Sequence, residues 1–199
     1  AWVLLALNAG LYSRDIAMLR WRDIRITGNA WRIDAIRNKT QIIQVCPLWP
    51  ETVAALRQLK GGNPEDYLFT TPAGGPYFSE RAVFEGSGKV LKVVRHDAIA
   101  RAFGRTIEPL KIKRAGVNFG AFRHTHVRAT ATHADVNARK VVRGHQVDGI
   151  EAHYDYQDIS RLKSVTDLAR VKLLKSTKAR RPARKAAPSG SRNPARTAG

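Results

Sequence analysis

The chain has 199 residues and a formal net charge of +19, with an isoelectric point of about 10.9. Hydrophobic residues make up 43% of it, which fits one globular domain and excludes a wholly disordered protein. The excess of positive charge predicts a polyanionic partner, nucleic acid before membrane. No apolar run approaches the length of a membrane span, which argues against a transmembrane protein.

The chain has one cysteine, Cys46, so it can form no internal disulfide, and we expect a reducing, cytoplasmic location. No cluster of cysteine and histidine has the spacing of a zinc site, and the sequence predicts neither a metal nor another cofactor. The apolar opening, residues 1–7, lacks the basic leader of a signal peptide. We interpret it as a core helix.

The pattern of apolar residues predicts an α+β fold, mostly α-helical with a small antiparallel β-sheet. Helices are predicted at 1–9, 13–20, 50–59, 96–107, 121–133, 136–142 and 158–173. Short strands are predicted near 24–28, 31–36 and 41–46, with a hairpin turn at 27–29. Residues 62–95 are predicted to be rich in loops, because they contain the breakers 74–76 and 85–88.

The last segment, residues 175–199, differs in composition from the rest. It holds eight basic residues and no acidic one, in a stretch rich in Pro, Ala, Ser and Gly. Such a segment cannot bury enough apolar surface to fold alone. We therefore expect one domain at 1–174 and a disordered basic tail that contacts DNA phosphates without reading sequence. A tail that only improves solubility is the alternative.

Three side chains between residues 123 and 154 have the chemistry to attack a phosphodiester. Tyr154 could supply the oxygen nucleophile. Arg123 offers a fixed fork of donors for two phosphate oxygens, and His145 could donate to the same group. Tyr156 is a rival nucleophile. The alternatives are packing tyrosines, a structural ion pair for the arginine, and a capping or core histidine.

The segments that carry these residues resemble the catalytic domain of the tyrosine recombinase (phage integrase) family. The resemblance covers roughly residues 1–174. It rests on Ala121-Phe122-Arg123-His124-Thr125, Arg143-Gly144-His145 and His153-Tyr154, on a first box at 10–24, and on a lysine-bearing hairpin at 38–48. The spacing from Arg123 to Tyr154 is specific to this family, whereas the match in the first box is less specific.

The resemblance implies a site-specific DNA recombinase or integrase that forms a covalent phosphotyrosyl intermediate through Tyr154, without metal. It assigns Arg123 and His145 to the scissile phosphate and Lys39 to protonation of the leaving oxygen. It also implies double-stranded DNA as partner, a homo-tetramer on paired sites, and a prokaryotic protein at the nucleoid. The family's N-terminal DNA-clamping domain has no counterpart in this sequence. A topoisomerase that uses the same chemistry is a closely related alternative.

Two positions depart from the family's pattern. Tyr12 stands where the family places its first arginine, so that Arg14 becomes a fifth, doubtful catalytic candidate. Gly120 stands where the family usually has a histidine or another large side chain. Residues 46–56 resemble a divergent set of integrase-like proteins that also relax the first box. The alternative function is therefore a catalytically impaired, integrase-like protein that still binds DNA.

Overall fold

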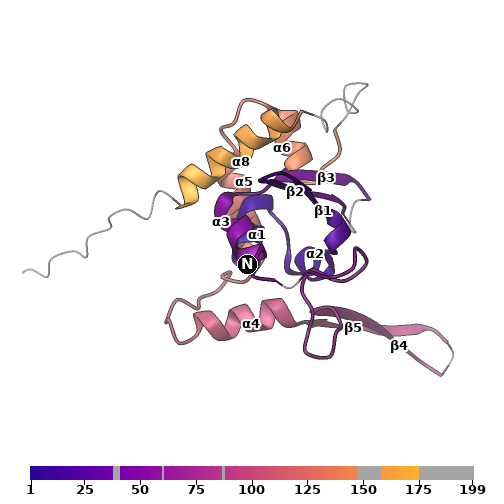
Figure 1. Ribbon diagram of the computed structural model, residues 1–199. Helices are drawn as coiled ribbons and strands as arrows, with labels where there is room; N and C mark the ends of the chain where they lie inside the picture. Colours follow the sequence, from indigo (N-terminus) through magenta and orange to yellow (C-terminus); the bar gives the residue numbers. More distant parts are fainter. Residues whose placement is uncertain (38–40, 60, 87, 148–157, 175–199) are drawn as a thin grey trace, which may run out of the picture.

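The computed structural model describes residues 1–37, 41–59, 61–86, 88–147 and 158–174 (Figure 1). They form an α+β fold with a three-stranded antiparallel sheet, in the order β1-β2-β3, and a separate two-stranded hairpin, β4-β5. The predicted fold class is confirmed at this level. None of the described helices is both long and apolar enough to span a bilayer.

The elements follow the predicted order closely. The helices are α1 Trp2–Ala9, α2 Ser13–Met18, α3 Pro50–Leu56, α4 Ala98–Ile107, α5 Ala121–Thr130, α6 Val136–Val142 and α8 Ile159–Leu174, with a short 3-10 helix, η1, at Trp21–Asp23. The strands are β1 Ile24–Thr27, β2 Ala30–Ile36, β3 Ile43–Pro47, β4 Phe78–Phe84 and β5 Val90–Asp97. The predicted helices and the first three strands are thus confirmed, with shifted ends.

The prediction of a loop-rich segment at 62–95 was wrong for its second half, where β4 and β5 pair. The glycines at 85–88 do not break structure there but form the hairpin turn, in which Glu85 and Gly88 share a backbone hydrogen bond. Both faces of this ribbon are largely exposed, so its sequence lacks the alternation of a half-buried strand. Figure 1 shows the hairpin projecting from the body of the chain.

Helix α1 lies at the centre of the core. Apart from Asn8 it is apolar on all sides, and it packs against α2, α3, α5 and α8. Strand β3 packs against α6 and α8 on the other side of the core. Cys46 is fully buried in this strand as a free thiol. The chain after α1, before α2 and after α6 meets the beginning of α5, through contacts of Arg123 with Gly10 and His145 and of Gly120 with Tyr12.

The polar side chain of Asn8 is fully buried near the end of α1 and joins it to β3 and α3. Its amide donates to the Pro47 carbonyl at 3.0 Å. Its oxygen accepts from the Trp49 backbone at 2.7 Å and from the Thr52 hydroxyl at 3.0 Å. The side chain thereby satisfies polar groups that have no access to water.

We predict that Asn8→Ala destabilises the fold by about 2–3 kcal/mol, because it leaves a buried donor and a buried acceptor unpaired. Urea unfolding followed by circular dichroism measures this. Asn63→Ala, at an exposed position, is the control and should change the free energy of unfolding by less than about 0.5 kcal/mol. Equal stability of the two variants would contradict this role of Asn8.

Candidate active site

Arg123 lies on the buried face of α5, and its guanidinium joins three segments that are distant in sequence. The residue is 6% exposed. Its Nη1 donates to the Gly10 carbonyl at 2.6 Å, and its Nη2 lies 2.7 Å from His145 Nε2 and 3.5 Å from the Arg143 carbonyl. The structure thus brings together two of the residues that the sequence singled out, Arg123 and His145.

The end of α6 sets the position of His145. Gly144 has φ 63°, and its N–H donates to the Val141 carbonyl, while the His145 N–H donates to the Lys140 carbonyl. This pair of bonds is the Schellman motif that ends many helices. It turns the chain sharply after α6 and directs the His145 ring toward α5. His145 is exposed, so the site meets solvent on this side.

His145 is a neutral imidazole in this arrangement. Because the Arg123 guanidinium can only donate, Nε2 of His145 must accept, and its proton therefore lies on Nδ1. Partial burial lowers the pKa of His145, and the charges of Arg123 and Arg37 lower it further. An anion placed between these groups would act in the opposite direction and favour the protonated imidazole.

Arg37 is a second buried guanidinium at this place, beside Arg123, and the sequence reasoning missed it. It follows β2 and is 5% exposed. Its Nη2 forms an ion pair with Asp15 at 3.5 Å. A signal was available: Ile33 and Ala35 occupy the inward face of β2, and the period of two places residue 37 on that same face.

The two positions that depart from the family's pattern lie beside each other in space. A Cβ atom added to Gly120 would lie 3.6 Å from Cε1 of the Tyr12 ring. That ring in turn contacts both arginines, with its centroid 5.1 Å from Cζ of Arg123 and 5.7 Å from Cζ of Arg37. Tyr12 therefore lies where the small residue at 120 leaves room, against the two guanidinium groups.

Arg14 is not part of this cluster. Its side chain is 48% exposed, forms an ion pair with Glu80 of β4 at 3.1 Å, and stacks on the Phe78 ring. Tyr154, Tyr156, Lys39 and the basic tail lie outside the described residues. Within the described part of the chain, no group of three His, Cys, Asp or Glu residues could hold a metal ion.

His126 lies one turn beyond Arg123 on α5, on the same buried face of the helix. Its Nδ1 donates to the Leu7 carbonyl at 2.8 Å, and its Nε2 is buried without a hydrogen-bond partner. Burial lowers the pKa of His126 to about 4. A Cβ atom on Gly10 would approach this ring to 2.9 Å, so the glycine allows the close contact.

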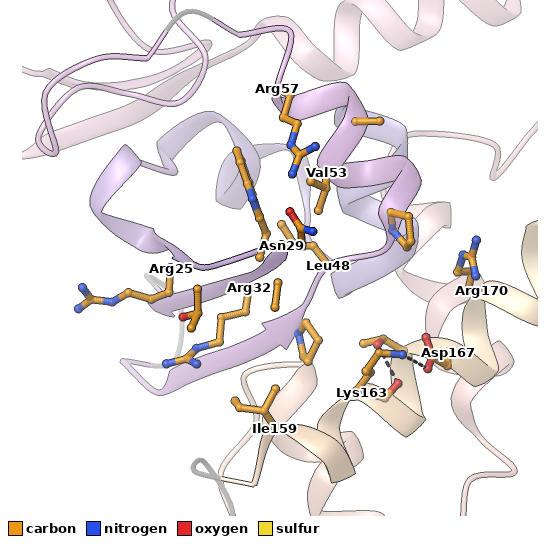
Figure 2. Close-up of a pocket in the computed structure, with 17 residues that line it drawn as sticks. Arg25, Asn29, Arg32, Leu48, Val53, Arg57, Ile159, Lys163, Asp167 and Arg170 are labelled. Atoms are coloured by element: carbon orange, nitrogen blue, oxygen red, sulfur yellow. Dashed lines mark hydrogen bonds and ion pairs between the residues drawn. The ribbon is translucent and has the colours of Figure 1, made fainter.

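A second region of the molecule contains a cavity of about 630 Å³, which Figure 2 shows. It is lined by the β1–β2 hairpin, α3 and α8, and Figure 2 shows Arg57 and Arg170 at its edge. None of the residues around Arg123 lines it. Several of its cations have acidic partners, among them Lys163 with Asp167 and Arg170 with Glu51, while Arg57 lies over the Trp31 ring. We therefore place the candidate chemistry at Arg123 and not in this cavity.

Comparison with known proteins found no family model and no curated protein that matches this chain. The family resemblance therefore rests on the residues quoted above.

We predict that Gly144→Ala destabilises the protein more than Gly28→Ala. Both glycines have a positive φ, 63° and 58°, so alanine costs each about 1–2 kcal/mol of backbone strain. Only at Gly144 would the new Cβ meet neighbours, Arg37 Cδ at 3.0 Å and Gln44 Cβ at 3.2 Å. We expect a further loss of about 1–3 kcal/mol there, measured by thermal unfolding. Equal losses of stability in the two variants would show that a Cβ atom fits at Gly144 without a clash.

We predict that His126 makes the protein less stable in acid. Its folded-state pKa of about 4 lies below the ordinary 6.5, so only the unfolded chain binds this proton between the two values. Stability present above pH 6.5 should fall by up to about 3 kcal/mol as the pH decreases to about 4.

Urea unfolding at several pH values tests this with His126→Gln, which should lose that part of the pH dependence. His124→Gln changes an exposed histidine on the same helix and should keep it. A constant difference between wild type and His126→Gln from pH 7 to pH 4 would refute the assignment.

Proposed function

We propose that this chain is the catalytic part of a site-specific DNA recombinase or integrase that breaks and rejoins DNA through a covalent phosphotyrosyl intermediate. The observation that carries the proposal is the direct contact of Arg123 with His145, at 2.7 Å, in a cluster of buried cations. The order and spacing of these residues are those of the family that the sequence resembles.

The chemistry of Arg123 supports a role at a phosphate. Two of its donors are held by backbone carbonyls, which fix the plane of the guanidinium before any ligand arrives. Donors that are already in place lower the barrier because they need not reorganise as charge develops. Burial lowers the pKa of Arg123, and the neighbouring Arg37 adds to this effect, so the group would gain from an anionic ligand.

The reaction would exchange one phosphodiester for another. The Tyr154 oxygen would form a bond to phosphorus while the bond from phosphorus to the leaving DNA oxygen breaks. The phenol proton must leave Tyr154, and the released hydroxyl must gain a proton. His145, neutral in this site, is suited to interact with the phosphate as charge accumulates, and the resemblance assigns the second transfer to Lys39.

The rest of the chain is consistent with a DNA partner. The net charge of +19 favours binding to a polyanion, and the basic residues of 175–199 would add phosphate contacts. The coarse α+β architecture, with an antiparallel pair of β2 and β3, supports the proposal. Lys39 falls in the sequence between these two strands, outside the described residues. We extend the proposal to assembly as a homo-tetramer on paired sites, as the family's chemistry requires two strand exchanges.

The decisive experiment traps the covalent intermediate. The protein is mixed, in EDTA, with a library of nicked duplexes of random sequence, and DNA that survives a denaturing wash is recovered and sequenced. We expect an adduct that Tyr154→Phe abolishes. Arg123→Ala should slow its formation about 100-fold or more, because it removes a preorganised donor.

Tyr156→Phe is the matched control and should still form the adduct. If wild type binds the same duplexes and forms no adduct, the chain is a DNA-binding protein without this activity. That second function is favoured by one observation, the replacement of the family's first arginine by Tyr12.

A further inference from the structure

The side chain of Arg37 is buried, and in the described part of the chain its charge has an ion pair with Asp15 and a contact with the Tyr12 ring. It is 4% exposed, and its ion pair with Asp15 has a separation of 3.5 Å. Its Nε is buried with no hydrogen-bond partner among the residues that the structure describes. Burying a charge that is incompletely paired costs several kcal/mol, so such a group calls for a further ligand.

The charges around Arg37 identify the ligand as an anion. Arg37 and Arg123 contact the same Tyr12 ring, and Asp15 is the carboxylate that interacts with both. The Asp15 carboxylate also accepts a hydrogen bond from the Tyr12 backbone N–H at 3.1 Å. Part of its hydrogen-bonding capacity is therefore already used. Among the described residues, Asp15 thus forms an ion pair with Arg37 and acts on Arg123 only through its charge.

The positions of the backbone bring Arg37 to the same point as His145. A Cβ atom on Gly144, the residue before His145, would lie 3.0 Å from Cδ of Arg37. Arg123 contacts His145 directly. The three side chains come from β2, α5 and the end of α6, and they converge on one place.

We propose that Arg37 is a catalytic residue that binds the scissile phosphate together with Arg123, where Tyr12 has replaced the arginine of the first box. This inference rests on the proposed function. Arg37 neutralises one non-bridging oxygen and Arg123 the other as negative charge accumulates on the pentavalent phosphorus. The Tyr12 ring contacts both guanidinium groups and lies in the space that Gly120 leaves.

The test compares Arg37→Met with Arg14→Met on the duplex that the trapping experiment recovers. Methionine keeps an unbranched stem beside Gly144 and removes the guanidinium with its charge and N–H donors. We expect Arg37→Met to slow single-turnover adduct formation about 100-fold or more, with a dissociation constant for DNA within a few-fold of wild type. Arg14→Met removes a cation already paired with Glu80 and should stay within about three-fold.

A second substrate distinguishes charge neutralisation from a structural role. It carries a neutral methylphosphonate, in one of its two diastereomers, at the cleaved position. Because this group needs one positive charge fewer, Arg37→Met should cleave it at a rate within a few-fold of wild type. The same 100-fold loss on both substrates, or no loss on either, would overturn the assignment. If Arg37→Met does not fold, Arg37→Gln replaces it. This variant also lacks the positive charge and should be slow on the phosphate substrate alone.

A binding measurement keeps this inference separate from the enzymatic proposal. Inorganic phosphate is titrated into protein labelled with nitrogen-15 at arginine, and the Nε–H signals of Arg37 and Arg123 are followed. If both signals shift with phosphate and the trapping experiment yields no adduct, the anion site is supported and the recombinase proposal is refuted. An adduct that survives Arg37→Met unchanged would refute Arg37 and leave the recombinase standing.

Discussion

The hydrogen bond from Arg123 to the Gly10 carbonyl is the constraint on which the site depends. It fixes the first helix of the core to the helix that carries the cation. The same guanidinium contacts His145, which follows α6. One buried charge therefore fixes the relative positions of α1, α5 and the end of α6. A buried guanidinium must keep such partners, and its neighbours are therefore shaped around it.

The charge balance distinguishes this place from the other basic surface of the molecule. In the cavity of Figure 2, basic side chains such as Arg170 have acidic partners on neighbouring elements. Around Arg123, within the part of the chain that the structure describes, Asp15 forms an ion pair with Arg37 and acts on Arg123 only through its charge. A protein that folds with this excess of positive charge accepts a loss of stability, which ligand binding can offset. Phosphate is the ligand whose charge and donor requirements fit.

Local patterns in the sequence predicted most of the fold, because helix periods, capping residues and the β1–β2 turn are encoded within a few residues. The β4–β5 hairpin was not predicted because both of its faces are largely exposed. Its sequence therefore lacks the alternation of apolar and polar residues that indicates a strand. In the site, motif spacing identified Arg123 and His145. Arg37 was missed because its role depends on contacts between β2, Tyr12 and Gly144, which are distant in the chain and meet only in the fold.

The most direct test of the account is to locate an oxyanion in a crystal of the protein soaked with tungstate, by anomalous scattering. The account predicts one dominant tungsten peak within hydrogen-bonding distance of the Arg123 and Arg37 guanidinium groups and beside His145. A peak confined to the cavity between α3 and α8, with these three side chains unoccupied, would contradict the claim that they form one phosphate site.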